Sequence, residues 1–460
     1  MAQSIISGLV SSTPSISPLV KISATGKTLG TLLLLLLALP FNATVVLLSL
    51  LWSAITKPFQ PRVVAAQPKN ILISGGKMTK ALQLARSFHA AGHRVILVES
   101  YKYWLTGHRF SCAVSGFYTV PIPEKNPQAY TQALLHIVQQ EQIDVYVPVC
   151  SPIASYYDSL VKPALSQHCE VFHCDAEMTQ MLDDKYAFSQ IAKSFGLSVP
   201  KSFKINDPEQ VINFDFSPEQ RQYILKSIPY DSVRRLNLTK LPCDTPEATA
   251  EFVRSLPISP AKPWIMQEFI PGREFCTHST VRDGEIKLHG CCQSSAFQVN
   301  YEHVDHPQIL AWVQHFIQQL GITGQVSFDF IQAEDGQVYA IECNPRTHSA
   351  ITMFYNHSGV ADAYLGDGEL IQPLVDSKPT YWLYHELWRL TEIVSLSQLG
   401  NWLRNIVRGQ DAIYQLHDPL PFLMVHHWQI PLLLLQNLVQ LRGWVKIDFN
   451  IGKLVELDGD

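Results

Sequence analysis

Residues 324–346 constrain the fold more than any other part of the chain, because they have the pattern of two β-strands joined by a tight turn. The first ten residues alternate apolar and polar side chains, as in a strand with one buried face. Asp335 and Gly336 form a dipeptide that favours a two-residue hairpin turn, and an apolar run follows as the return strand. The sequence therefore predicts an antiparallel hairpin here.

The same hairpin carries the side chains of a metal site. With a two-residue turn, counting back along both strands places Asp329 directly opposite Glu342. Like charges that face each other across a sheet are destabilising, so this pair needs a cation. Asn344 lies on the same face, and oxygen ligands suit a hard ion such as Mg²⁺ or Mn²⁺. Arg346 follows as a planar donor fork suited to phosphate. The competing interpretation is an exposed hairpin with scattered acids.

Composition excludes several classes of protein. The 460 residues are enough for two to three domains, and 47% of them are hydrophobic against 16% charged. A net charge of −5 and no clustering of basic residues give no reason to expect a nucleic acid partner. Nine cysteines without a repeated C-x-x-C predict neither a disulfide framework nor a zinc site. A reducing, cytoplasmic compartment is expected for the catalytic part.

Residues 28–56 contain no charged side chain and include six consecutive leucines, which is long enough to span a bilayer. We expect a single membrane anchor, whose removal with residues 1–66 would leave a soluble, active protein. A signal peptide and an apolar helix docked on the protein are the alternatives. Pro40 and Asn42 also suggest a kink or two shorter interfacial helices.

The next segment has the pattern of a small doubly wound α/β domain. Residues 70–99 contain a buried strand, a glycine-rich turn, a helix and a second strand, which together form a β-α-β unit. Glu99 stands where a dinucleotide-binding fold keeps its ribose-binding acid, but the glycines fall short of G-x-G-x-x-G. Further strands at 116–120 and 144–149 complete the domain. NAD binding is therefore a weak alternative.

Two lysines and two glutamates follow in positions that suggest a nucleotide site. Lys185 lies in the first turn of a helix, where a cation gains nothing from the helix dipole and needs an anionic partner. Lys226 is the only charge inside an apolar strand, which suggests a phosphate contact. Glu268 and Glu274 flank a turn beside extended backbone that could bind a base and a ribose.

Taken in order, these residues resemble the ATP-grasp superfamily. The matching pieces are D-K at 184–185, the strand lysine at 226, Q-E-F-I-P-G-x-E at 267–274, Asp329, and E-x-N-P-R at 342–346. One departure is the segment after the strand lysine, which lacks the glycines of the family's flap and offers Arg234 and Arg235 instead.

The resemblance implies a role for each matching residue. It implies that the nucleotide phosphates are contacted by Lys185 and Lys226, the latter also in catalysis. It implies an adenine linker formed by Gln267, Glu268, Phe269 and Ile270, with the ribose held by Glu274. It implies a metal held by Asp329, Glu342 and Asn344. It implies that Arg346 binds the transferred phosphate.

The whole chain is similar to the cyanobacterial ATP-grasp ligases that make mycosporine-glycine. That resemblance implies an ADP-forming C–N ligase whose substrates are ATP, an amino acid such as glycine, and the cyclohexenone 4-deoxygadusol. Three alternatives remain open: a carboxylate–amine ligase that works through an acyl phosphate, a membrane-tethered nucleotide-binding protein without ligase activity, and a dinucleotide-dependent oxidoreductase.

The expected fold class is mixed α/β and α+β, with an ATP-grasp fold preceded by a small doubly wound domain and an N-terminal hydrophobic helix. The expected divisions are an N-terminal segment at 1–66, an α/β domain at 67–175, an ATP-grasp domain at 176–375 and a C-terminal extension at 376–460.

Overall fold

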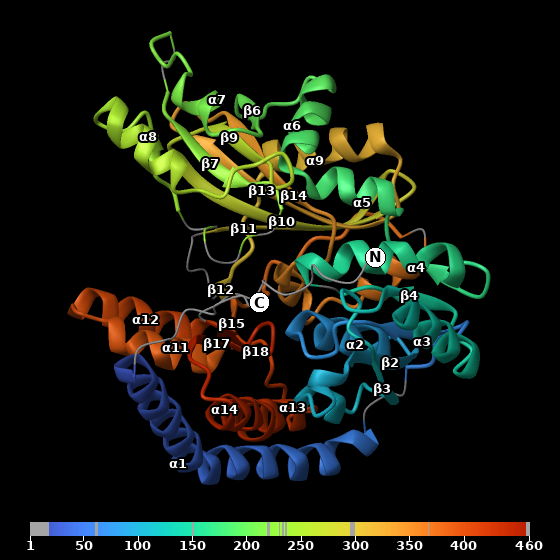
Figure 1. Ribbon diagram of the computed structural model, residues 1–460. Helices are drawn as coiled ribbons and strands as arrows, with labels where there is room; N and C mark the ends of the chain where they lie inside the picture. The colour runs from blue at the N-terminus through green and yellow to red at the C-terminus, as the bar shows by residue number, and fades with distance from the viewer. Residues whose placement is uncertain are drawn as a thin grey trace, which may run out of the picture.

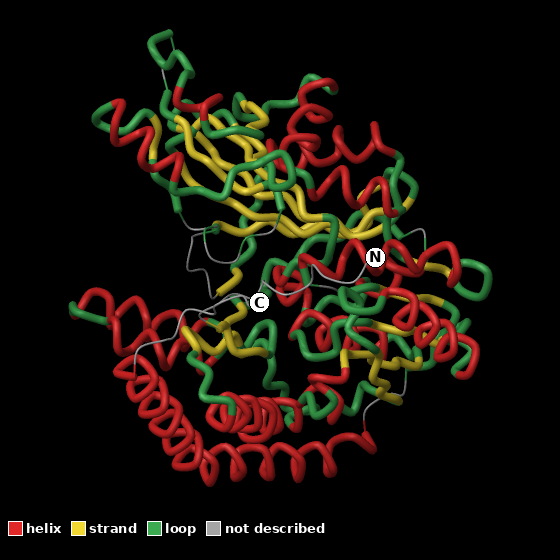
Figure 2. The backbone as a smooth tube through the Cα atoms, viewed as in Figure 1, coloured by secondary structure: helices red, strands yellow, loops and turns green. Residues whose placement is uncertain are grey.

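The computed structural model describes residues 18–59, 63–149, 151–218, 221–229, 231, 234, 237–294, 300–366 and 368–456. Figure 1 shows two lobes, one built mainly on two four-stranded sheets and the other on a parallel sheet beside a helical C-terminal segment. Figure 2 shows the longest strands in the first lobe and shorter strands, among many helices, in the second.

The first unit is a five-stranded parallel sheet in the order β3-β2-β1-β4-β5. Its apolar strands bury both faces, one under α2 and the other under α3 and α4, which confirms the doubly wound arrangement. The strands are β1 (Asn70–Ile73), β2 (Arg94–Ser100), β3 (Gly116–Val120), β4 (Val145–Val147) and β5 (Glu170–Val171). The helices are α2 (Thr79–Ala90), η2 (Tyr101–Tyr103), η3 (Gly107–Phe110), α3 (Pro127–Gln140) and α4 (Pro152–Leu165).

The glycine-rich turn after β1 serves packing. Gly75 has a φ of +69°, and a Cβ there would lie 1.8 Å from the carbonyl oxygen of Val149, so only glycine fits. Glu99 accepts hydrogen bonds from the backbone amide and the Nζ of Lys77, at 3.1 and 3.3 Å. The acid that resembled a ribose ligand therefore closes this turn, which disfavours the dinucleotide alternative.

The next unit contains two four-stranded sheets, ordered β6-β9-β7-β8 and β11-β10-β13-β14. Helix α9 packs its apolar side on the second sheet, around Phe316 and Phe328. The strands are β6 (Ser202–Ile205), β7 (Tyr223–Ser227), β8 (Lys240–Leu241), β9 (Trp264–Glu268), β10 (Gly272–Arg282), β11 (Glu285–Gln293), β13 (Gly324–Ala333) and β14 (Val338–Asn344). The helices are α5 (Ala176–Asp183), α6 (Lys185–Ser194), α7 (Glu209–Ile212), α8 (Pro246–Arg254), α9 (Pro307–Leu320), η4 (Ser349–Phe354) and α10 (Val360–Leu365).

The C-terminal segment packs on the parallel-sheet unit. Arg86 of α2 donates from Nε to Asp418 at 2.8 Å in a buried ion pair, and Trp382 donates to Thr79 at 3.0 Å. Its strands, with the adjoining β12, are β12 (Asn300–Tyr301), β15 (Thr380–Tyr381), β16 (Gln410–Asp411), β17 (Trp444–Asp448) and β18 (Lys453–Glu456). Its helices are α11 (Leu383–Arg389), η5 (Leu390–Glu392), α12 (Leu396–Arg408), α13 (Leu420–Met424), η6 (Val425–Gln429) and α14 (Ile430–Val439).

The N-terminal hydrophobic helix is present as α1 (Pro18–Thr56), followed by η1 (Lys57–Phe59). Figure 1 shows it bent along the outer edge of the molecule, beside α14 and α13. Leu35 and Val46 belong to the same buried core as α2 and α14. Helix α1 is therefore packed on the folded protein, and it is also long and apolar enough to cross a membrane by length and composition, so the separable anchor expected at residues 1–66 stays a prediction.

Candidate active site

The hairpin of β13 and β14 has Asp329 paired with Glu342, as predicted. The predicted two-residue turn is wrong, because Ala333 pairs with Gln337 across a three-residue loop in which Gly336 has a φ of +86°. A bulge between Asp329 and Phe330 then shifts the register by one residue. The two deviations cancel, so the two carboxylates still face each other.

Three strands place acids on one face of this sheet. Glu274 on β10 lies beside Ile331, two residues along from the Cys276–Asp329 pair, so Glu274 shares a face with Asp329 and Glu342. Burial, followed by the charges of Glu342 and Glu274, raises the pKa of Asp329 to about 7. Burial also raises the pKa of Glu274 above its ordinary value. The strands therefore hold three mutually repelling carboxyl groups together.

Cations reach this acid cluster from other elements. Lys185, in the first turn of α6, lies 3.6 Å from Glu342, which is the anionic partner that its position predicted. Lys226 comes from β7 of the other sheet, and burial lowers its pKa although the nearby Glu342 opposes that shift. Burial alone would raise the pKa of Glu342, but Lys185, Lys226 and Arg346 lower it overall. The two sheets therefore meet at a mixed-charge cluster.

Asn344 connects the metal-ligand candidates to the arginine. Its Oδ1 accepts a hydrogen bond of 2.7 Å from Nη1 of Arg346, and its side chain also hydrogen-bonds Glu342 and lowers the pKa of that acid. Asn344 thus orients both the acid and the arginine.

The donor set fits Mg²⁺ only with help from a ligand. Among the residues that the structure describes, no group of three or more His, Cys, Asp or Glu side chains is arranged to hold a metal ion. Asp329, Glu342 and the amide of Asn344 are instead two carboxylates and one neutral oxygen. Mg²⁺ is commonly bound by one or two carboxylates together with substrate phosphates, so this set matches a metal that arrives with a nucleotide.

Part of the predicted adenine linker already makes hydrogen bonds within the protein. Gln267 accepts from Nζ of Lys226 at 3.2 Å and donates from Nε2 to the carbonyl of Ile341, also at 3.2 Å. The backbone amides of Glu268 and Phe269 donate to the carbonyls of Lys201 and Gln222. These two amides are therefore already bonded within the protein, and the role of residues 267–270 as an adenine linker stays a prediction.

The side chain of Glu268 points away from the cluster. It lies 3.4 Å from Arg221 and accepts from the amide of Lys201 at 3.1 Å. In the segment with Arg234 and Arg235, Arg234 pairs with Asp231 at 3.0 Å, whereas Arg235 lies outside the described residues.

The sequence reasoning missed residues on both sides of the cluster. Asp183 ends α5, and burial raises its pKa while Arg346 and Lys185 oppose the shift. Its neighbour Asp184 is the N-cap of α6. Because a helix needs only one N-cap, the presence of both Asp183 and Asp184 before Lys185 could have indicated that one of them faces the site.

Lys80, His278 and His348 form a second missed group next to Arg346. Nζ of Lys80 donates to the carbonyl of Thr347 at 2.6 Å, and the amide of His348 donates to Nδ1 of His278 at 3.3 Å. Burial, followed by the charges of Lys80 and Arg346, lowers the pKa of His348 to about 3. Lys80 belongs to α2, so no local pattern in the sequence places it here.

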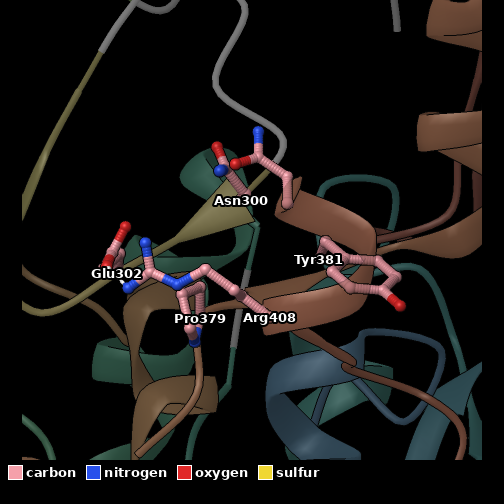
Figure 3. A pocket seen from close by; sticks show the side chains of 6 residues that line it. Asn300, Glu302, Pro379, Tyr381 and Arg408 are labelled. Atoms are coloured by element: carbon pink, nitrogen blue, oxygen red, sulfur yellow. Dashed lines mark ion pairs between the residues drawn. The ribbon is translucent and has the colours of Figure 1, made fainter. Parts of the chain in front are cut away.

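A small pocket lies elsewhere, at the sheet of β12, β15 and β16 (Figure 3). Arg408 and Glu302 pair there at 3.6 Å. The lining residues are Asn300, Glu302, Pro379, Tyr381, Asn405 and Arg408. None of the residues predicted for nucleotide or metal binding is among them, so we assign this pocket no part in the site.

Comparisons by sequence find one remote relative. No protein-family model matches the chain. The C-terminal section of the large chain of carbamoyl phosphate synthase from Methanopyrus kandleri is 22% identical in an alignment 230 residues long that covers 45% of this chain. The matched region spans 41% of that relative's length.

Comparisons by structure find similar solved proteins. The ADP complex of PurK, N5-carboxyaminoimidazole ribonucleotide synthetase, matches with a TM-score of 0.52 and 14% identity over 70% of this chain and 82% of that one. Biotin carboxylase from Campylobacter jejuni, in complex with β,γ-ATP, matches with a TM-score of 0.51 and 15% identity over 66% and 73%. These neighbours are ATP-grasp ligases. The predicted fold class is confirmed, and this chain has the ATP-grasp fold with a parallel-sheet unit before it and an apolar N-terminal helix.

Proposed function

We propose that this protein is an ATP-dependent, ADP-forming ligase that joins an amine to a small acceptor by a C–N bond. The observation that carries the proposal is the cluster of Lys185, Lys226 and Arg346 around the facing carboxylates of Asp329 and Glu342. The ATP-grasp fold supports it.

The site residues keep the roles that the sequence suggested. Mg²⁺, or Mn²⁺ in its place, would be held by Asp329, Glu342 and Asn344 and would neutralise the nucleotide phosphates. Lys226 and Lys185 would contact those phosphates, and Gln267 would fix the position of Lys226. Glu274 would hold the ribose. Because the three acids repel one another, a bound dication would relieve a repulsion that the fold already contains.

Phosphoryl transfer depends mainly on cations that stabilise the phosphate charge and on the exclusion of water from the site. It depends less on a pair formed by a nucleophile and a general base. An acceptor oxygen would attack the γ-phosphorus of ATP, and the bond to ADP would break. The amine would then attack the acceptor carbon, so that a C–N bond forms and the C–O bond to phosphate breaks. Phosphate would leave with the acceptor oxygen and the amine would lose a proton. Arg346 would stabilise the transferred phosphate.

We place the acceptor beside Lys80, His278 and His348. Nε2 of His278 is buried and makes no hydrogen bond with any part of the chain that the structure describes. Lys80 supplies positive charge next to both histidines, and Arg346 supplies it next to His348. An anionic or enolic oxygen would find donors there, close to Arg346. By resemblance, the acceptor is 4-deoxygadusol and the amine is glycine.

The second candidate is a carboxylate–amine ligase that works through an acyl phosphate. Lys185, Lys226 and Arg346 would stabilise this intermediate too, because an acyl phosphate and an enol phosphate both carry their negative charge on the phosphate group. The fold supports this candidate equally, since its neighbours include an enzyme named as a carboxyaminoimidazole ribonucleotide synthetase.

Product analysis tests the proposal. The purified protein with ATP, Mg²⁺, 4-deoxygadusol and glycine should form ADP, phosphate and a coupled product only when acceptor and amine are both present. Oxygen-18 in the acceptor should appear in the phosphate. AMP, or phosphate without the label, would contradict the mechanism. An inert 4-deoxygadusol and glycine pair, with turnover of a carboxylate acceptor, would favour the second candidate.

A further inference from the structure

The protein-facing side of α1 is its polar side. Between residues 25 and 56, where burial is described, five side chains are buried at positions spaced for one helical face, and three of these five are polar. They are Thr28, Leu35, Asn42, Val46 and Ser49. A helix of a water-soluble protein has the opposite arrangement, with apolar residues towards the core.

Hydrogen bonds tie this polar side to the C-terminal segment over most of the helix. Nζ of Lys27 donates to the carbonyl of Val445 at 2.7 Å, near the start. Nδ2 of Asn42 lies 2.6 Å from the hydroxyl of Tyr384 and 2.7 Å from Nε2 of His427. Ser53 donates to the carbonyl of Leu416 at 3.0 Å, near the end. A helix held in this way from 27 to 53 lies along the protein and does not cross a bilayer away from it.

The outward side of α1 is apolar. From Leu29 to Ile55 its exposed residues include one polar side chain, Thr44, whose hydroxyl donates to the carbonyl of Pro40 within the helix. Leu34 and Leu37 are each 67% exposed. The exposed large apolar residues are Leu29, Leu33, Leu34, Leu36, Leu37, Phe41, Leu47, Leu48, Leu50, Leu51, Trp52 and Ile55.

Charge and hydropathy identify what covers this face. The described residues 18–59 contain no acidic side chain, and an 18-residue window within residues 25–59 reaches a mean hydropathy of 2.4 while only 17% of that window is buried. Interfaces between protein subunits are only about 65% apolar even in homodimers. The outward face of α1 carries one exposed polar side chain, Thr44, between residues 29 and 55. This face is therefore more apolar than an interface with another protein requires, and it matches the acyl region of a lipid bilayer.

Neighbouring aromatic and apolar groups extend the surface. Trp388 is 52% exposed, and Nζ of Lys27 lies 5.9 Å from its ring. Leu435 of α14, the helix beside α1, is also exposed. Tryptophan is enriched at the boundary between lipid and water. Pro40 lies inside the helix, and proline is the usual cause of a sharp bend such as the one in Figure 1.

We propose that α1 binds the surface of a lipid bilayer as an in-plane helix, with its polar side docked on the protein and its leucine face in the acyl region. The whole catalytic unit would then rest on one leaflet. The proposal rests on α1 and its contacts and is independent of the reaction that the ligase catalyses.

Vesicle flotation of the full-length protein tests binding. Wild type should float with phosphatidylcholine vesicles, and it should still do so in about 0.5 M salt, because the contact is apolar. The triple variant Leu34→Gln, Leu37→Gln and Leu48→Gln should lower partitioning at least ~100-fold, since each change removes a large apolar surface. The control changes Leu238, Leu370 and Val375, exposed apolar residues outside α1, to glutamine and should bind as wild type does.

Labelling distinguishes an in-plane helix from a spanning one. Cysteine placed at Thr25 and, separately, at Thr56 should react with an impermeant maleimide added outside the vesicles, as read by peptide mapping. Protection of one end until detergent is added would overturn the in-plane arrangement. A soluble wild type that does not float, and that forms dimers which the triple variant disperses, would overturn the proposal in favour of a second copy of the chain.

Discussion

At the scale of single residues, the site depends on two carboxylates that the hairpin forces together. Glu342→Gln should lower kcat by roughly 10³-fold or more, because the metal that neutralises the phosphates loses a charged ligand. Asp329→Asn should lower it less, since Glu342→Gln removes the ion-pair partner of Lys185 as well as a charged metal ligand. Steady-state rates of ADP formation measure both effects.

The matched control lies in the same hairpin. Glu334 is exposed in the loop, so Glu334→Gln removes the same charge outside the acid cluster and should keep the wild-type rate. Near-normal turnover of Glu342→Gln would remove the hairpin from the active site.

Gln267 was assigned only to an adenine linker from the sequence, and the structure adds a hydrogen bond from Lys226 to its side chain. Gln267→Leu should raise KM for ATP about 10-fold or more, because a hydrogen bond to a charged group contributes about 1.5–3 kcal/mol and Lys226 would lose its fixed position. Lys226→Met should affect KM and kcat together. An unchanged KM in Gln267→Leu, with an unchanged melting temperature, would show that the hydrogen bond has no part in nucleotide binding.

At the scale of elements, one buried ion pair joins the C-terminal segment to α2. Asp418 accepts from Arg86 at 2.8 Å, from Ser111 at 2.6 Å and from the amide of Cys112 at 2.8 Å. Asp418→Asn should lower the free energy of unfolding by about 3–5 kcal/mol, because it leaves the Arg86 charge buried without its partner. Urea unfolding measures the change.

The pH dependence of this pair has a definite sign. Burial would raise the pKa of Asp418, but Arg86 and the hydrogen bonds lower it overall, below the value of about 3.9 for an unfolded aspartate. The stabilisation is therefore complete above that value and is lost as the pH falls through the folded-state pKa. The exposed pair of Arg254 and Glu209 is the control, and Glu209→Gln should cost under about 1 kcal/mol.

Helix α1 packs on the rest of the protein, and we expect this packing to contribute to stability. Deleting residues 1–66 removes Leu35 and Val46 from the core, each worth about 1.5–3 kcal/mol of burial, and exposes the side chains that Asn42 bonds. The truncated protein should melt at a lower temperature and aggregate. A soluble truncation with an unchanged melting temperature would show that the docking contributes nothing to stability.

At the scale of the whole molecule, the candidate site is assembled from two units, the one with the two four-stranded sheets and the parallel-sheet unit. The two sheets contribute Lys226 and the carboxylates, α6 contributes Lys185, and α2 contributes Lys80 through its contact with Thr347. A nucleotide bound at this junction should stabilise the folded protein as a unit, by about 2.7 kcal/mol at a concentration 100-fold above its Kd. The melting temperature measured by thermal unfolding should rise with ADP, and rise further when Mg²⁺ is also present. In Glu342→Gln the additional rise caused by Mg²⁺ should be lost.

Local sequence determined much of this protein. Short apolar runs predicted the strands of the parallel sheet, and alternation of apolar and polar residues predicted the hairpin. Lys185 was correctly placed in the first turn of a helix, and the order of charged residues indicated the ATP-grasp fold. These signals are readable because each depends on neighbours within a few positions along the chain. The roles of the site residues and the divisions between domains remain proposals.

Tertiary structure decided the remainder. The loop length and the bulge in the hairpin cancel each other, and only the assembled ladder shows both. Lys80 and Asn42 meet partners more than 260 residues away, at Thr347 and at Tyr384 and His427. A hydropathy pattern records that α1 is apolar, but it does not record which face is covered. That choice depends on the polar groups that a distant segment offers, and only the folded chain brings them together.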